Sequence, residues 1–152
     1  MLGQIYFELK DDINSIANYE LADKIVPGNY ANIKPLVKLY VKTENVKANE
    51  ITNTFFNLAP TNPTIYNDLE EIYFSYNKGD SLIAFYKGKF VAFKDNGKVL
   101  GNLNFYLGRI YLETDKKLAK DYFLKAKDIF TKVYDKDHPV FNAIEDGIKK
   151  AD

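Results

Sequence analysis

Residues 107–126 read LGRIYLETDKKLAKDYFLKA, and the spacing of apolar and small residues in this stretch decides the fold. Tyr111 lies four positions after Leu107, and Phe123 lies four positions after Ala119. Residues three or four positions apart share one face of an α-helix, whereas neighbouring residues of a strand alternate between two faces. The stretch therefore predicts two amphipathic helices. We expect these helices at 98–113 and 116–134.

The same pattern recurs along the chain. When tyrosines in similar settings are aligned with Leu107/Tyr111, three further Leu/Tyr pairs show the same spacing, and a small residue follows two of these tyrosines by eight positions. The two later copies agree further at a shift of 38 residues, which aligns Phe85 with Phe123 and the segment 87–89 with 125–127. The three other Leu/Tyr pairs are Leu2/Tyr6, Leu36/Tyr40 and Leu69/Tyr73, and the small residues are Ala48 and Ser81.

These intervals resemble the tetratricopeptide signature, in which Leu-Gly-x-x-Tyr is followed by a small residue, an aromatic residue and then a proline. The resemblance covers nearly the whole chain, although Val37 and Glu70 replace the small Gly in two copies. It implies an all-α, right-handed α-solenoid of about four stacked helix-turn-helix hairpins plus a C-terminal capping helix. The implied repeats are approximately 1–29, 30–62, 63–100 and 101–138, and the implied capping helix is 139–151.

Turn residues fall where the hairpins should end, at 27–29, 60–63 and 95–97. The segment 83–97 allows two interpretations, a β-hairpin or a helix, and the spacing of its aromatic residues favours the helix. Pro139 suits the first turn of a last helix, which Asp137 or His138 could cap. We expect the other helices near 1–9, 12–26, 30–43, 46–58, 63–77, 80–94 and 139–151.

Composition excludes several function classes. Lys+Arg and Asp+Glu both count 21, and this balance argues against a nucleic-acid-binding protein, which needs a basic excess. The chain has no Cys, so disulfides and thiolate catalysis are excluded. No apolar run reaches the roughly 20 residues that span a bilayer, and no signal peptide precedes the first helix, so we expect no membrane partner and a cytoplasmic location. The excess of Lys over Arg hints at a bacterial origin.

No constellation of catalytic residues is evident. His138 is the only histidine, and with Asp135 and Asp137 it would make a weak metal site, but a polar loop and helix cap is the favoured interpretation. We therefore predict no enzyme activity, no metal and no cofactor. A small enzyme or ligand-binding helical domain remains a third alternative, supported only by the 12 Tyr and 11 Phe.

In the tetratricopeptide family, the first helix of each hairpin lines a concave groove that binds a partner. The resemblance implies that an acidic peptide would meet Lys34, Lys38 and Arg109, with Phe74 and Phe105 as apolar anchors. Lys38 stands where carboxylate-clamp members of the family have Asn, so no such clamp is expected. The full candidate groove is Lys34, Lys38, Asn67, Glu71, Phe74, Phe105, Arg109 and Leu112.

The leading hypothesis is thus a non-catalytic scaffold or adaptor that binds a protein segment in the groove. The alternative is a structural role, as part of a longer helical solenoid or through self-association at the ends of the stack. The start at Met1 favours this alternative, because it falls inside the first helix of a repeat. Either the first repeat is truncated, or the chain is the C-terminal part of a longer repeat protein.

Overall fold

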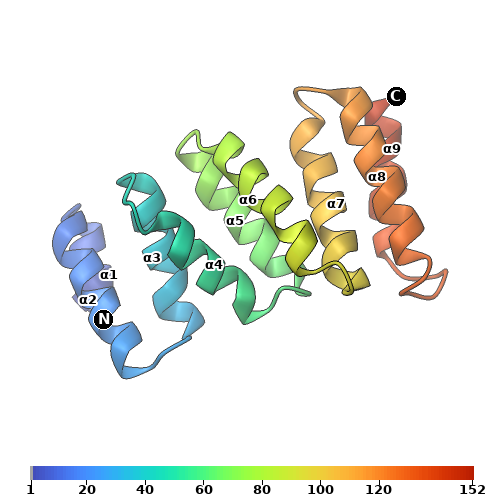
Figure 1. Cartoon of the computed structure of the whole chain (residues 1–152). Helices are drawn as coiled ribbons and strands as arrows, with labels where there is room; N and C mark the ends of the chain where they lie inside the picture. Colours follow the sequence, from blue (N-terminus) through green and yellow to red (C-terminus); the bar gives the residue numbers. More distant parts are fainter. Residues whose placement is uncertain (1) are drawn as a thin grey trace. The chain divides into compact units, whose positions relative to one another are not determined.

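A computed structural model describes residues 2–152, and every regular element in that range is an α-helix (Figure 1). The expectation of an all-α protein is confirmed, whereas the arrangement of the helices as a right-handed solenoid of stacked hairpins stays a prediction. The helices are α1 (Leu2–Glu8), α2 (Asp12–Ile25), α3 (Tyr30–Lys42), α4 (Ala48–Leu58), α5 (Pro63–Ser75), α6 (Gly79–Ala92), α7 (Gly97–Tyr111), α8 (Lys116–Phe130) and α9 (Val140–Ala151).

The segment 83–97 is the C-terminal part of α6 and a turn, so the helical interpretation is confirmed and the β-hairpin is wrong. Asn96 does not form a hairpin turn, because its side chain accepts a hydrogen bond from Val99 N and caps α7. The N-cap residue of α9 is Pro139, which forms no side-chain cap, and Val140 N donates to Nδ1 of the preceding His138 over 3.2 Å. The prediction for α8 was too long: the helix ends at Phe130, and turns continue to residue 133.

Three helix ends repeat one backbone geometry. Lys10, Glu44 and Asn77 have φ of 60°, 53° and 57°, the left-handed conformation that non-glycine residues rarely adopt. They follow α1, α3 and α5 at intervals of 34 (44 minus 10) and 33 (77 minus 44) residues. In each case the next residue donates its N–H to the carbonyl of the tyrosine from the Leu-x3-Tyr pattern, at 2.8–2.9 Å. This pairing is the Schellman motif, and its regular spacing is physical evidence of an internal repeat.

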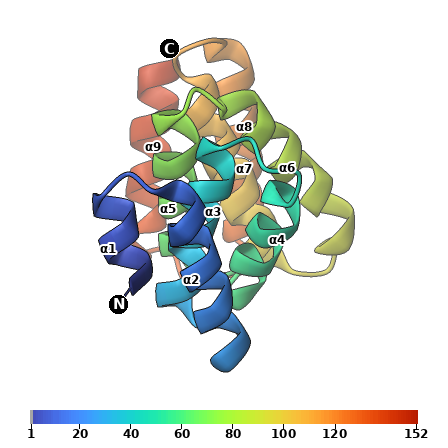
Figure 2. The same cartoon turned by 90° about the vertical axis from the view of Figure 1, so that its left-hand side faces the viewer.

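The chain divides into two compact units, 1–78 and 79–152. In the first unit, α1 and α2 lie side by side and antiparallel (Figure 2), α2 and α4 each contact α3, and α5 contacts both α3 and α4. In the second, α7 contacts α6 and α8, and α9 contacts α8 and α7. The first unit has seven Lys against ten Asp and Glu, a formal charge of −3, and the second has 14 Lys and Arg against 11 Asp and Glu, a charge of +3. The division falls inside the implied repeat 63–100, and the repeat boundaries stay a prediction.

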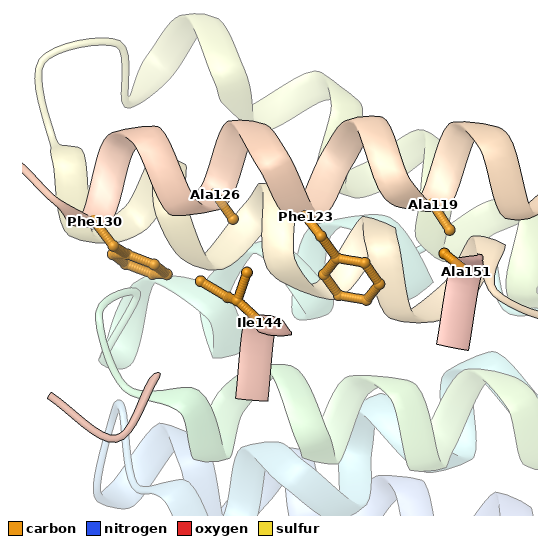
Figure 3. Close-up of a cluster of buried hydrophobic side chains, with 6 residues drawn as sticks. All are labelled: Ala119, Phe123, Ala126, Phe130, Ile144 and Ala151. Carbon is orange, nitrogen blue, oxygen red and sulfur yellow. The ribbon is translucent and has the colours of Figure 1, made fainter. Parts of the chain in front are cut away.

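One hydrophobic core cluster of the second unit lies between α8 and α9. Ala119, Phe123, Ala126 and Phe130 project from α8 toward α9, where Ile144 and Ala151 face them (Figure 3). All but Ala151 are fully buried. The small residues allow the two helices to approach closely, and the phenylalanines fill the space between them.

The glycine of the Leu-Gly-x-x-Tyr pattern makes room for an aromatic ring. A Cβ on Gly3 would lie 2.8 Å from the Tyr19 ring, and one on Gly108 would lie 2.9 Å from the Phe123 ring. Both distances are too short, so only Gly fits beneath the ring. In the second copy, Val37 replaces Gly and is fully buried, and the residue 15 positions later is the smaller Thr52, which is also fully buried.

Candidate functional site

Lys34 lies at the contact between α3 and α5. Its Nζ is 2.6 Å from Oδ1 of Asp68, and the hydroxyl of Tyr30 donates to the other oxygen of the same carboxylate. The Asp68 side chain is only 10% exposed. Burial lowers the pKa of Lys34, but the hydrogen bond to Asp68 and the charges of Asp68, Tyr30 and Glu71 together raise it above its ordinary value. Lys34 therefore fixes α3 to α5, and its charge is already compensated.

The rest of the predicted groove in the first unit forms one surface. Asn67, Glu71 and Phe74 follow helical spacing on α5 and are all exposed, and Phe74 is 48% exposed. Glu71 is close enough to Lys34 to contribute to its raised pKa. Lys38 lies over the Phe7 ring, with Nζ 5.1 Å from the ring centroid. We call Lys34, Lys38, Asn67, Glu71 and Phe74 the α3–α5 surface.

The three predicted residues of the second unit divide into two classes. Phe105 contacts Phe123 edge-on with ring centroids 5.7 Å apart, and Leu112 packs against the same cluster. Both are half-buried, and their contacts are those of core residues. Arg109 is exposed, with its guanidinium 5.0 Å from the ring centroid of Tyr106. Five of the eight predicted groove residues thus lie in the first unit, and three lie in the second.

Two lysines flank a pair of stacked tyrosines in the second unit. Lys87 Nζ of α6 donates to the Tyr111 hydroxyl over 2.9 Å, and Tyr111 stacks on Tyr122 with parallel rings 5.7 Å apart. Lys125 Nζ lies 5.4 Å from the Tyr122 ring centroid. The hydrogen bond to Tyr111 raises the pKa of Lys87, and burial raises that of Tyr122. We call Lys87, Tyr111, Tyr122 and Lys125 the lysine–tyrosine row.

Neither lysine of the row has a carboxylate within ion-pair distance among residues 2–152. Lys87 and Lys125 thus keep their full positive charges at the surface. Our sequence analysis missed the row as a site. The shift of 38 does align Lys87 with Lys125, and this was the signal that could have pointed to it.

An open groove of about 640 Å³ continues from the row. It lies between α6 and α8 above α7, and Tyr122 and Lys125 belong to both the row and the groove wall. Asp128 also lines it but pairs with Lys132 at 2.8 Å, so Lys125 supplies its uncompensated charge. The remaining lining residues are Phe90, Asn104, Leu124 and Ile129.

The first unit has a hollow of about 340 Å³ in the corresponding place, between α2 and α4 above α3. Its lining includes three acidic residues, Glu20, Asp23 and Glu50, and two lysines, Lys24 and Lys47. Glu20 accepts a hydrogen bond from the Tyr40 hydroxyl and lies 3.6 Å from Lys47 Nζ. The carboxylate of Glu20 is therefore already paired with side chains of this chain.

The outer face of α1 and α2 is apolar. Five apolar residues of this face are each more than half exposed, and they follow helical spacing. A shallow hollow of about 180 Å³ lies between α1 and α2. The corresponding exposed positions of α9 are polar. The apolar set is Leu2, Ile5, Leu9, Leu21 and Ile25. The exposed residues of α9 include Asn142, Asp146, Lys149 and Lys150.

Within residues 2–152, no group of three or more His, Cys, Asp or Glu side chains is arranged to hold a metal ion. His138 stacks on Tyr134, with ring centroids 4.0 Å apart, in addition to its contact with the start of α9. In the same range, every helix is too short or too polar to cross a membrane.

Comparison of the chain with models of protein families found no match, and comparison with curated protein sequences found none either.

Proposed function

We propose that the chain is a tetratricopeptide-like, non-catalytic protein-interaction module that binds a segment of another protein on the α3–α5 surface. The observation that carries the proposal is the exposed Phe74, which lies on a ridge with Asn67 and Glu71. Aromatic side chains on a rigid surface are typical anchors of protein interfaces. The Lys34–Asp68 pair supplies the rigidity, because it joins α3 to α5.

The charge pattern of this surface does not favour an acidic ligand. Lys34 is compensated by Asp68, and Glu71 adds a negative charge beside Lys38 and Lys34. We therefore expect apolar contact with Phe74 to contribute more to binding than attraction by the lysines. This changes the chemistry expected of the partner relative to the acidic peptide that the sequence suggested.

A photo-crosslinking experiment tests the proposal. A photoreactive phenylalanine analogue replaces Phe74, and in a control it replaces Val46, which is almost fully exposed in a loop of the same unit. We expect one partner to crosslink at position 74 and not at 46. The crosslinked segment, made synthetically, should bind the purified chain and lose most of its affinity for Phe74→Ser, but not for Val46→Ser.

Equal crosslinking at the two positions, or a segment that binds Phe74→Ser as well as the unchanged chain, would rule out the α3–α5 surface. Circular dichroism of each variant separates loss of binding from loss of fold. Phe74 is half exposed, so we expect its replacement by Ser to leave the helices intact.

A second function, self-association, is favoured by the apolar outer face of α1 and α2. Contiguous exposed apolar side chains mark interaction sites in soluble proteins. Two copies meeting through this face would bury both apolar faces at once, whereas contact with the polar face of α9 would bury only one. Sedimentation equilibrium should then give a mass that rises with concentration, and Leu21→Lys/Ile25→Lys should abolish the rise. A constant monomer mass at high concentration would contradict self-association.

A further inference from the structure

We propose that the groove between α6 and α8, together with the lysine–tyrosine row, binds an acidic peptide segment of a partner protein. An aliphatic or aromatic side chain of the segment would occupy the groove, and its carboxylates would pair with Lys87 and Lys125. This site shares no residue with the α3–α5 surface. It can therefore hold or fail independently of the function proposed above.

Charge complementarity is the first argument. Several surface lysines of this chain have an acidic partner, as Lys127 has Glu145 at 2.5 Å and Lys132 has Asp128 at 2.8 Å. Lys87 and Lys125 instead contact phenol rings, which attract a cation but carry no charge to compensate it. The tyrosine stack holds the two ammonium groups in place, so little conformational freedom is lost when a carboxylate binds.

The groove supplies the apolar part of the site. Phe90, Leu124 and Ile129 lie along it, and Leu124 is 46% exposed. Asn104 is buried beneath it, and its amide nitrogen donates to the Leu100 carbonyl over 2.8 Å. That bond fixes the Asn104 side chain in the lining of the groove. Apolar walls with a few fixed polar groups are typical of binding sites.

A single-stranded nucleic acid is the other anionic ligand that lysines and tyrosines could attract. The geometry favours the peptide, because Tyr111 and Tyr122 stack on each other with parallel rings and no base can enter between them. The row also contributes only two uncompensated cations, whereas a strand of nucleic acid is held by a groove that follows many phosphates.

Fluorescence anisotropy with the full chain tests the inference. The probe is a short labelled peptide with leucines flanked by glutamates. Two comparison peptides carry Lys in place of each Glu, or Ser in place of each Leu, and a labelled oligothymidylate is the fourth probe. We expect the acidic leucine peptide to bind more tightly than the other three. In heteronuclear NMR spectra, its addition should shift the signals of Tyr111, Tyr122 and Leu124.

Three variants locate the binding. Lys87→Glu/Lys125→Glu should weaken binding of the acidic peptide by about fivefold to thirtyfold, since two exposed ion pairs are lost. The control Lys136→Glu/Lys149→Glu has the same change in net charge, at exposed lysines for which no ion pair is found in residues 2–152, and should leave affinity unchanged. Leu124→Ser should weaken binding without changing its dependence on salt.

Equal loss of affinity in the two double variants would show that only net charge matters and would overturn the proposal. Tighter binding of the oligothymidylate, or equal binding of the acidic and basic peptides, would overturn it as well. Because these probes are defined peptides and the α3–α5 test uses a crosslinked cellular partner, failure of one test leaves the other standing.

Discussion

At the scale of single residues, several glycines leave room for an aromatic ring that packs against the backbone. A Cβ on Gly101 of α7 would lie 2.2 Å from the ring of Phe130, which is fully buried. The ring cannot move away without opening the α8–α9 core. By contrast, a Cβ on Gly88 would meet no atom within 4 Å. Close packing against Phe130 therefore requires Gly at position 101, whereas no packing contact requires it at position 88.

We predict that Gly101→Ala lowers the free energy of unfolding by about 1–3 kcal/mol, because the new methyl group overpacks the core. Gly88→Ala should raise it by about 0.5–1 kcal/mol, because Ala is favoured over Gly inside a helix. Urea unfolding followed by circular dichroism measures both. An unchanged or stabilised Gly101→Ala would mean that α7 and α8 are not packed as closely as described.

The residue scale is also where the sequence pattern carries the least information about the site. Phe105 and Leu112 fit the helical spacing of the predicted groove, but they also fit the spacing of a core face, and the contacts with the α8–α9 cluster are those of core residues. Asp68 was overlooked, although it stands next to the predicted Asn67. Its burial depends on Lys34 and Tyr30, which are 34 and 38 residues away, and a one-dimensional pattern does not contain that pairing.

At the scale of helices, the Schellman ends impose a backbone cost on two side chains. Lys10 and Glu44 occupy the left-handed region, in which Cβ comes close to the following carbonyl oxygen. Asn77 has the same φ but tolerates it better, because Asn is one of the few residues that adopts this conformation readily.

We predict that Lys10→Gly stabilises the chain by about 0.5–1 kcal/mol, the net of relieved strain and the added flexibility of Gly in the unfolded state. Asn77→Gly should give a smaller gain. Lys10→Ala is the control, since it removes the lysine side chain but keeps Cβ, and it should give no gain. Thermal unfolding of the three variants measures the change in stability of each. A gain in stability for Lys10→Ala would contradict the backbone explanation.

Helices were the part of the fold that the sequence predicted best. Their starts depend on local chemistry, such as Asn29, Asn62 and Asn96, whose side chains cap α3, α5 and α7. Their ends were predicted less well, and most expected helices were one to four residues too long. The Schellman turns explain part of this error, because Lys10 and Glu44 are not residues that typically mark the end of a helix.

At the scale of the whole chain, folding holds several tyrosines in the neutral form. The pKa of five tyrosines is raised, and burial is the largest cause in each of them. Nearby carboxylates raise the pKa further for Tyr19, Tyr30 and Tyr40. A raised pKa contributes stability that is fully present below the unfolded-state pKa of about 10 and is lost as the pH rises through the folded-state pKa. The tyrosines with a raised pKa are Tyr19, Tyr30, Tyr40, Tyr73 and Tyr122.

We therefore predict that stability is insensitive to these groups at neutral pH and falls steeply above about pH 10. The phenolate absorbance should rise in two phases, and the later phase should coincide with loss of helical circular dichroism. Tyr40→Phe removes the group with the largest upward shift and should make the alkaline transition less steep. A single phenolate transition with the helices intact would contradict this account.

Our sequence analysis predicted the helical class and the recurrence of one pattern, because both follow from local spacing. The stack, its groove and the functional partner remain proposals, since they depend on contacts between distant helices. The net charge also differs between the whole chain and its parts. The chain is neutral as a whole, but its two units carry formal charges of −3 and +3.

That division of charge has a practical consequence for anyone who purifies the protein. A charged chromatography matrix responds to the local surface that it touches, and not to the sum over the molecule. At low ionic strength, the first unit should adsorb to an anion exchanger and the second to a cation exchanger. The chain should therefore be retained by both resins near its isoelectric point of about 6.6, where it would not migrate in an electric field.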